Sequence, residues 1–487
     1  MSAPIPFAEW RPDMPALSQW SREALNVVPA EDSYRPLNAL SGTSGALAAP
    51  AQGAAWFRGT DGGTRMFAGD SSRLYRLAAT AWNDASRAVG GPYAAGADNQ
   101  WRFAQFGALA LAANGVDVPQ KFDLGAGTRW SALGGNPPVA TFIATVRDFL
   151  VMAKIGNTPQ RVQWSGFNNA ETWGSALSTQ ADLQDLPDGG NITGLVGGEF
   201  GLVFQEASVR RMTYEGPPVV FRIDKIASDI GATVPGSVAG VLDLAFFLHK
   251  SGFYMVQGGQ SVRAIGRGKV DRTFWAEFDE TNQFRCSSAI DPVRGLYVFA
   301  YPGAGSTGGP NRLLIYNWRA ERWSRADVPC ELVFGGASQE AFTLEQLDSF
   351  GTLHDLPYSL DSSYWTGPLA LLLFGFDTSH RSGAFSGETL EATLETGEFA
   401  PGGGSRAVLR GLRPLIDGGS PRVRIGARER QQDNVAYGNA VGLTPAGLAP
   451  VYGSGRYFRA RATIPAGSAW SNAQGIDDLD VRPAGAQ

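Results

Sequence analysis

The sequence has little of what metal-binding or disulfide-bonded proteins need. Only two cysteines and three histidines occur among its 487 residues. The histidines, His249, His354 and His380, lie far apart, and no Cys-x-x-Cys or His-x-x-x-His spacing occurs, whereas a zinc site needs clustered ligands. Cys286 and Cys330 are too few for a disulfide framework, so we expect two free thiols in a reducing compartment. We predict no metal and no other cofactor.

Long apolar segments and charged side chains are also scarce. The longest apolar run, residues 369–376, is far shorter than the roughly 20 residues of a membrane-spanning helix. No basic region followed by an apolar core stands at the N-terminus, so we expect neither a signal peptide nor a membrane span. Charged residues make up 18%, with 41 basic and 46 acidic side chains. This mildly acidic balance argues against a protein that grips nucleic acid, because phosphate binding needs clustered Lys and Arg.

Glycine, proline and aromatic residues, by contrast, are abundant. The chain has 62 glycines and 29 prolines, and 11% of its residues are aromatic. With so little charge, this composition is typical of an all-β protein that is rich in turns. The length exceeds that of one ordinary domain and predicts two or three.

One unit of four short segments recurs between Trp56 and Trp323. In its clearest copy, apolar runs at 141–146 and 149–155 flank a polar pair at 147–148, which predicts a β-hairpin buried on both faces. A run at 160–164 and a closing segment around Trp173 complete this copy. Hairpin breaks recur every 40 to 53 residues, near Gly62, Gly107, Arg147, Gly198, Ser251 and Val293.

This period predicts an all-β fold built on a β-propeller of six or seven blades over residues 54–386. One copy would comprise segments 244–248, 253–256 and 261–265, and would close at Phe274-Trp275. A β-sandwich or jelly roll with accidental spacing is the alternative. In a propeller, four tryptophans should take comparable places late in their blades: Trp82, Trp130, Trp173 and Trp323.

The flanking segments predict an N-terminal arm and a C-terminal β-domain. The arm and linker, residues 1–53, would either close the ring with a strand or lie on a neighbouring subunit. In residues 387–487, strict alternation of apolar and polar residues predicts half-buried strands, with a polar, peripheral end at 477–487. Residues 343–351 should form one or two helical turns. An arginine-bearing face of the β-domain should contact another chain or solvent, through Arg424, Arg428, Arg459 and Arg461.

Catalytic signatures are missing from the sequence. The nearest approach to a nucleophile elbow, residues 42–46, lacks the final glycine and follows no predicted strand. The glycine-rich turn at 401–404 is not followed by Lys-Ser or Lys-Thr, so it is not a phosphate loop. Propellers also host glycosidases that use facing carboxylates, but facing pairs cannot be identified from spacing. A carbohydrate-binding or carbohydrate-cleaving propeller therefore stays an alternative function, as does a generic scaffold.

Five groups of segments, spread over nearly the whole chain, carry a resemblance to a known family. They are residues 26–29 with 34–37, 343–348, 360–365, 376–381 with 385–387, and 455–461 with Trp470 and 475–477. They resemble segments of the tail nozzle proteins (tail tubular or hub proteins) of short-tailed bacteriophages. Larger members of that family carry insertions between blades that this compact chain lacks.

The resemblance implies a structural subunit without enzymatic activity. Copies would form a ring, a hexamer in this family, at the distal end of the tail, and the genome would leave through it. The implied partners are other copies, a tail adaptor or portal-proximal protein, and tail fibres or a tail tip. The protein would belong to the virion tail and assemble in the host cytoplasm.

A conduit for DNA also sets an electrostatic expectation. Lys or Arg facing the duplex would add affinity through counterion release and slow its passage, so DNA should pass without tight binding. We therefore predict neutral or acidic lumen loops. Glu277, Asp279 and Glu280 form an acidic cluster whose first interpretation is a solvated loop, and they are also our candidate for an acidic lumen loop. The arginine-bearing strands at 423–430 and 457–464 should turn away from the channel or pair with acidic neighbours.

Overall fold

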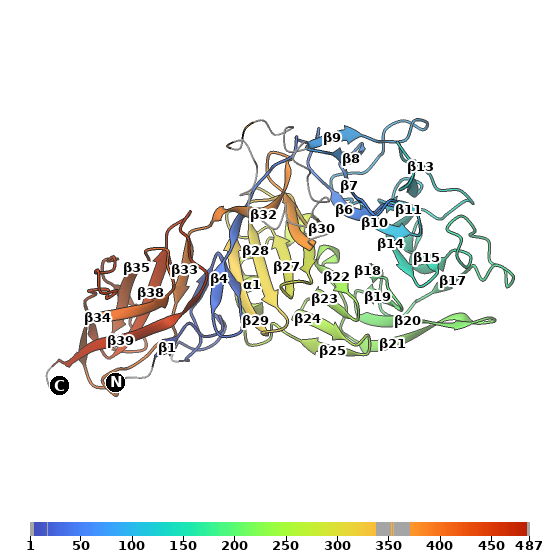
Figure 1. Cartoon of the computed structure of the whole chain (residues 1–487). Helices are drawn as coiled ribbons and strands as arrows, with labels where there is room; N and C mark the ends of the chain where they lie inside the picture. Colours follow the sequence, from blue (N-terminus) through green and yellow to red (C-terminus); the bar gives the residue numbers. More distant parts are fainter. Residues whose placement is uncertain (1–3, 17, 338–351, 353, 355–370, 485–487) are drawn as a thin grey trace.

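The computed structural model describes residues 4–16, 18–337, 352, 354 and 371–484, and nearly all of its regular structure is β-strand (Figure 1). Helical elements are short in this part of the chain: α1 (Asp271–Glu277) and the 3-10 turns η1 (Pro235–Ser237) and η2 (Glu280–Arg285). Among the described residues, no helix has the length and apolar character needed to cross a membrane. The helical turns predicted at 343–351 lie outside the described residues.

Seven four-stranded antiparallel units follow one another and form a β-propeller, which confirms the predicted fold class and excludes the sandwich alternative for this region. The first blade consists of β6 (Gly53–Arg58), β7 (Thr64–Gly69), β8 (Leu74–Ala78) and β9 (Ala81–Asp84). The second consists of β10 (Arg102–Phe106), β11 (Leu109–Ala113), β12 (Gln120–Asp123) and β13 (Ser131–Ala132). The third consists of β14 (Ala140–Val146), β15 (Phe149–Ile155), β16 (Thr158–Trp164) and β17 (Asp182–Asp185).

The fourth blade consists of β18 (Ile192–Val196), β19 (Gly201–Gln205), β20 (Ser208–Gly216) and β21 (Val220–Ser228). The fifth consists of β22 (Ala239–Val241), β23 (Leu244–His249), β24 (Gly252–Gln257) and β25 (Ser261–Ala264). The sixth consists of β26 (Ser287–Asp291), β27 (Leu296–Tyr301), β28 (Arg312–Asn317) and β29 (Arg322–Asp327). The seventh contains β30 (Leu332–Ala337), β31 (Leu371–Phe376), β32 (Ser382–Thr389) and β5 (Asn38–Leu40). Strand β30 contacts β6 of the first blade, so the ring closes.

The hairpin of β14 and β15 shows why these segments form blades. Val146 pairs with Phe149 across a two-residue turn, in which Arg147 takes a left-handed conformation with φ of 50°. Phe149, Leu150 and Val151 are all fully buried, so both faces of β15 are covered. A blade with two apolar faces cannot be stable alone and is covered by its neighbours.

Two details of the predicted repeat are wrong. Phe274 and Trp275 lie in helix α1, and the fifth blade instead begins with the small-residue strand β22. Trp173 precedes the last strand of its blade, β17, by several residues and lies in a loop. Of the other three tryptophans, Trp82 and Trp323 lie in fourth strands and Trp130 directly precedes one.

The N-terminal arm closes the ring. Its strand β5 pairs with β32 in the seventh blade, with Leu40 opposite Phe385 and Asn38 opposite Thr389. This is one of the two roles that the sequence left open. The rest of the arm joins the C-terminal domain through β1 (Ile5–Pro6), β2 (Glu23–Leu25), β3 (Val27–Pro29) and β4 (Tyr34–Pro36).

The C-terminal domain is a sandwich of two sheets. One has the order β3-β4-β39-β34-β37, with β1 also on β39, and includes β34 (Ala407–Ile416), β37 (Gly453–Gly455) and β39 (Ala473–Pro483). The other has the order β2-β33-β38-β35-β36, with β33 (Ala392–Glu395), β35 (Arg422–Arg428), β36 (Ala436–Tyr437) and β38 (Tyr457–Ile464). Residues 477–483 were expected at the periphery but continue β39, which pairs along its length with β34. The predicted domain boundary at 386/387 falls inside β32.

The second sheet continues without interruption into the propeller. Strand β2 pairs with β33 on one side and lies parallel to β29 of the sixth blade on the other, with Leu25 opposite Arg325. The result is one nine-stranded sheet that runs from β26 to β36. In Figure 1 the sandwich accordingly stands beside the blade formed by β26 to β29, with the arm between them.

Candidate functional site

The first strands of several blades surround a cavity of about 230 Å³. Because residues from or next to β6, β10, β14, β18 and β22 share it, and these strands belong to five successive blades, the cavity lies at the propeller axis. Its lining residues are Ala54, Ala55, Trp101, Arg102, Phe103, Phe142, Ile143, Gly194, Leu195, Pro235 and Val238. We call this space the axial cavity.

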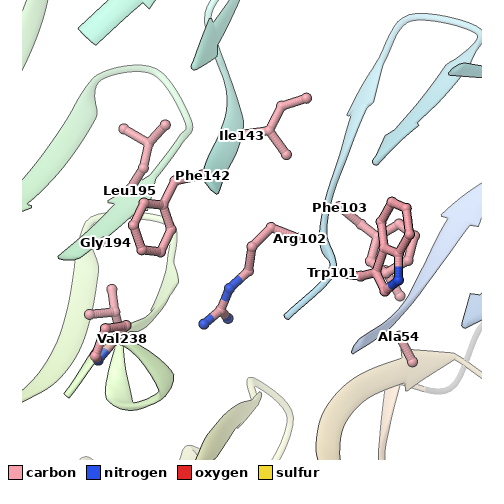
Figure 2. A pocket seen from close by; sticks show the side chains of 11 residues that line it. Ala54, Trp101, Arg102, Phe103, Phe142, Ile143, Gly194, Leu195 and Val238 are labelled. Atoms are coloured by element: carbon pink, nitrogen blue, oxygen red, sulfur yellow. The ribbon is translucent and has the colours of Figure 1, made fainter. Parts of the chain in front are cut away.

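Arg102 is the one charged residue of this otherwise apolar lining. Its side chain extends from the start of β10 into the space between Phe142, Val238 and Ala54 (Figure 2). The guanidinium carbon lies 5.8 Å from the centroid of the Phe142 ring, at the outer limit of a cation–π contact. Burial lowers the pKa of the Arg102 guanidinium to about 10, so the group remains a cation at neutral pH.

Gln100 fixes the position of this cation. Its Nε2 donates hydrogen bonds to the carbonyl oxygens of Phe284 and Cys286, at 2.7 and 2.9 Å, across the ring near the sixth blade. Its Oε1 then accepts a hydrogen bond from Nη2 of Arg102 at 2.7 Å. Because the amide nitrogen is used by the two carbonyls, the amide oxygen is held toward the guanidinium.

The arginines predicted from the sequence lie in the sandwich, away from the axial cavity. Arg428 and Arg459 donate to opposite oxygens of Glu398, at 2.9 Å from Nε of Arg428 and 3.0 Å from Nη2 of Arg459. Arg461 pairs with Glu395, and the side chains of Glu395 and Glu398 are only 2% and 1% exposed. We call these five residues the sandwich charge network. Contact of this face with another chain stays a prediction.

Arg424, the fourth of these arginines, stands beside the network. Its guanidinium carbon lies 5.0 Å from the centroid of the Tyr437 ring. The hydroxyl of Tyr437 in turn donates to Oε1 of Glu395 at 2.6 Å. Burial, and then the charge of Glu395, raises the pKa of Tyr437 to about 12. The phenol therefore stays protonated and acts as a donor at physiological pH.

The acidic residues named as a lumen loop lie at the end of α1 and the start of η2, and none of them lines the axial cavity. Glu277 accepts a hydrogen bond from the hydroxyl of Tyr301. Asp279 accepts from Nδ2 of Asn282 and the backbone N–H of Thr281, and these hydrogen bonds lower its pKa. Glu280 is exposed.

The remaining ionisable groups of the described residues lie apart from one another or in simple pairs. His249 lies with Nδ1 2.7 Å from the Ser251 hydroxyl, and burial lowers its pKa. His380 pairs with Glu331. Within the described residues, no group of three or more His, Cys, Asp or Glu side chains is placed to hold a metal. Both cysteines are buried free thiols.

The axial cavity was missed in the sequence, although one signal for it was visible. Arg102 stands between Trp101 and Phe103 in a largely apolar run, where a cation is out of place. The role of Gln100 gave no such signal, because its carbonyl partners lie more than 180 residues away.

No family model and no curated protein matches this chain. Among solved structures, it is similar to YCF48 bound to D1 peptide, with 10% identity over 61% of this chain and 86% of that chain and a TM-score of 0.37. BamB from Moraxella catarrhalis matches at 11% identity over 62% and 94%, with a TM-score of 0.31. The designed protein Ika8 matches at 8% identity over 71% and 98%, with a TM-score of 0.35. YCF48 and BamB are β-propellers, and the likeness extends to the fold alone.

Proposed function

We propose that this protein is a structural subunit of the tail nozzle of a short-tailed bacteriophage. Copies of it form a ring, a hexamer by family resemblance, through which the genome leaves the virion. It acts without enzymatic activity and docks on a tail adaptor or portal-proximal protein, with tail fibres or a tail tip as further partners. The proposal starts from the resemblance described above.

The places of the family-like segments support this proposal. Residues 26–29 and 34–37 include β3 and β4 of the arm, 376–381 form the turn from β31 to β32, and 455–461 lead into β38. These segments thus belong to the arm, to the blade that the arm closes, and to the sandwich. The family-like segments at 343–348 and 360–365 lie outside the described residues, and residues 475–477 lie in β39 of the sandwich.

The observation that carries the proposal is the continuous core and sheet between the domains. One hydrophobic cluster includes Trp323 of the propeller, Trp10 and Tyr34 of the arm, and Phe458 and Ile476 of the sandwich. Domains joined by a small polar interface move relative to one another, whereas a large apolar interface holds them together. A ring that must keep its bore during genome exit needs subunits of this rigid kind.

Polar contacts strengthen the same junction. Nε and Nη2 of Arg325, on β29, donate to the two carboxylate oxygens of Glu23 on β2, at 2.9 and 2.7 Å. Arg322 donates to the carbonyl oxygen of Phe7, and its guanidinium lies over the ring of Tyr34. The bidentate ion pair of Arg325 and Glu23 fixes the orientation of β2 against β29 as well as adding energy.

The axial cavity is not the DNA conduit in this proposal. Its volume is that of a small molecule, so the genome would pass between subunits and not through one propeller. A net charge of -5 suits a wall that repels phosphate, and Glu277, Asp279 and Glu280 remain candidates for it. A carbohydrate-cleaving propeller would use facing carboxylates, whereas the one charged residue lining the axial cavity is an arginine.

Ring formation can be tested directly on the purified chain. We expect closed rings in negative-stain images and a discrete oligomer by light scattering, with no tight binding of duplex DNA in moderate salt. Arg424→Glu, on the predicted contact face, should weaken the ring, whereas Arg267→Glu, an exposed turn residue of the propeller, should not. A monomer at every concentration, or salt-sensitive duplex binding, would count against the proposed role.

A further inference from the structure

The axial cavity holds a cation for which the described residues provide no countercharge. A guanidinium has five N–H donors, and the hydrogen bond that these residues offer it is the one to Gln100. Loss of hydration is the one cause that lowers the pKa of Arg102, and no acidic side chain acts on it. A charge that is partly withdrawn from water and has no countercharge favours an anionic partner, so this arrangement suits a site that receives an anion.

Apart from Arg102, the side chains that line the cavity are apolar, so an apolar body attached to that anion has side chains to pack against. Phe142 and Val238 lie on one side of the guanidinium, with Leu195 beyond Phe142, and Trp101 and Ala54 lie on the other side (Figure 2). A cavity of about 150 Å³ lined by apolar side chains is enough to hold benzene. The axial cavity, at about 230 Å³, has room for a ring and a carboxylate.

We propose that the axial cavity is a binding site for a small carboxylate with an apolar, ring-sized body. The carboxylate pairs with the free edge of the Arg102 guanidinium, and the body lies against Phe142, Leu195 and Val238. Gln100 is a positioning residue, since its anchored amide accepts the hydrogen bond from Nη2 of Arg102 and leaves the other N–H groups free for the carboxylate. Arg102 is only half-buried, so solvent and solutes reach it. This proposal does not depend on ring assembly.

Fluorine NMR with para-fluorobenzoate as the probe tests the site in the full chain. We expect saturable binding, and binding of the neutral amide para-fluorobenzamide that is weaker by roughly tenfold or more, because a hydrogen-bonded charge pair is lost. Arg102→Met should weaken para-fluorobenzoate binding by a similar factor. The control Arg267→Met, at an exposed turn, should bind as the unchanged protein does.

A second pair of variants keeps the test decisive if Arg102→Met fails to fold. Arg102→Lys keeps the charge and should retain part of the affinity for para-fluorobenzoate. Ala55→Leu keeps Arg102 and fills the cavity, so it should abolish binding of the ring. The proposal is overturned if no probe saturates, if the amide binds as well as the acid, or if inorganic phosphate binds as tightly as para-fluorobenzoate. Unchanged binding by both Arg102 variants would also overturn it.

Discussion

Replacing Glu398 by glutamine should destabilise the sandwich more than any single surface change. Glu398 bridges Arg428 and Arg459, and the three side chains are 1%, 6% and 14% exposed. Glutamine keeps the size and one acceptor oxygen but removes the charge. The network then holds three guanidinium groups and one carboxylate, that of Glu395.

The expected cost follows from the burial of Arg428. Breaking a buried ion pair by removing one partner costs roughly 3–5 kcal/mol, because the remaining charge is left without compensation. Arg428 keeps hydrogen bonds to the carbonyl oxygens of Gln431 and Asp433, and glutamine still accepts one bond. We therefore expect about 3 kcal/mol, the lower end of that range.

The measurement should report on the sandwich itself. Native-state hydrogen exchange, read on peptides from β35 and β38, gives the free energy of local opening there. The matched control is Glu429→Gln, since Glu429 pairs with Arg406 and the two side chains are 40% and 51% exposed. An exposed pair contributes roughly 1 kcal/mol or less. If the Glu398 variant loses no more protection than this control, the network is not desolvated and the reasoning is wrong.

Three further predictions concern the propeller and the arm. Burial raises the pKa of Asp271 from 3.8 to about 6, so the protein loses stability as the pH rises from about 4 to 6 and this carboxyl ionises. Asp271→Asn keeps an acceptor for the Phe253 N–H and should raise the unfolding free energy by about 1–3 kcal/mol at pH 8 but change it little at pH 3.5. Equal effects at both pH values would contradict this. Leu37 is 2% exposed and lies beside β5, so Leu37→Ala should lower the unfolding free energy by about 2–5 kcal/mol and speed amide exchange in β5 and β32. The control Leu443→Ala, at an exposed position, should change neither quantity. Cys286 and Cys330 are buried, and burial raises the pKa of both thiols, that of Cys330 to about 12. A thiol reagent should therefore label neither cysteine in the native protein and both after denaturation. Rapid labelling of the native protein would contradict this and would show that the blades open.

The repeat was predictable because its signal is local. Hairpins such as 140–155 place two apolar runs beside a two-residue turn, and all the required information lies within about 16 residues. The inner strand β22 was missed because Ala239, Gly240 and Val241 make no apolar run of their own. Trp173 and Phe274-Trp275 were wrongly predicted as strand residues because they are apolar. An aromatic residue fills a core equally well from a loop or a helix.

The arm and the axial cavity depend on pairings that no local pattern contains. Leu25 lies opposite Arg325, and Asn38 opposite Thr389, so each pairing joins residues 300 or more positions apart. The cavity likewise appears only when inner strands of different blades are brought together. A charged residue within an apolar strand, as at Arg102, indicates that such a position is special, but it does not show what surrounds it.

The interleaving of the arm also decides which experiments can separate folding from assembly. Removing residues 387–487 would take β33, the partner of β2, and the end of β32 that pairs with Asn38 of β5, so the arm would lose part of its anchoring together with the sandwich. Such a truncated chain could fail to form rings merely because it is unfolded. A point change at half-buried Arg424, whose recorded contact is with the Tyr437 ring, leaves the strand pairing intact. The subunit contact is therefore best tested by substitution on the sandwich face and not by deletion of the domain.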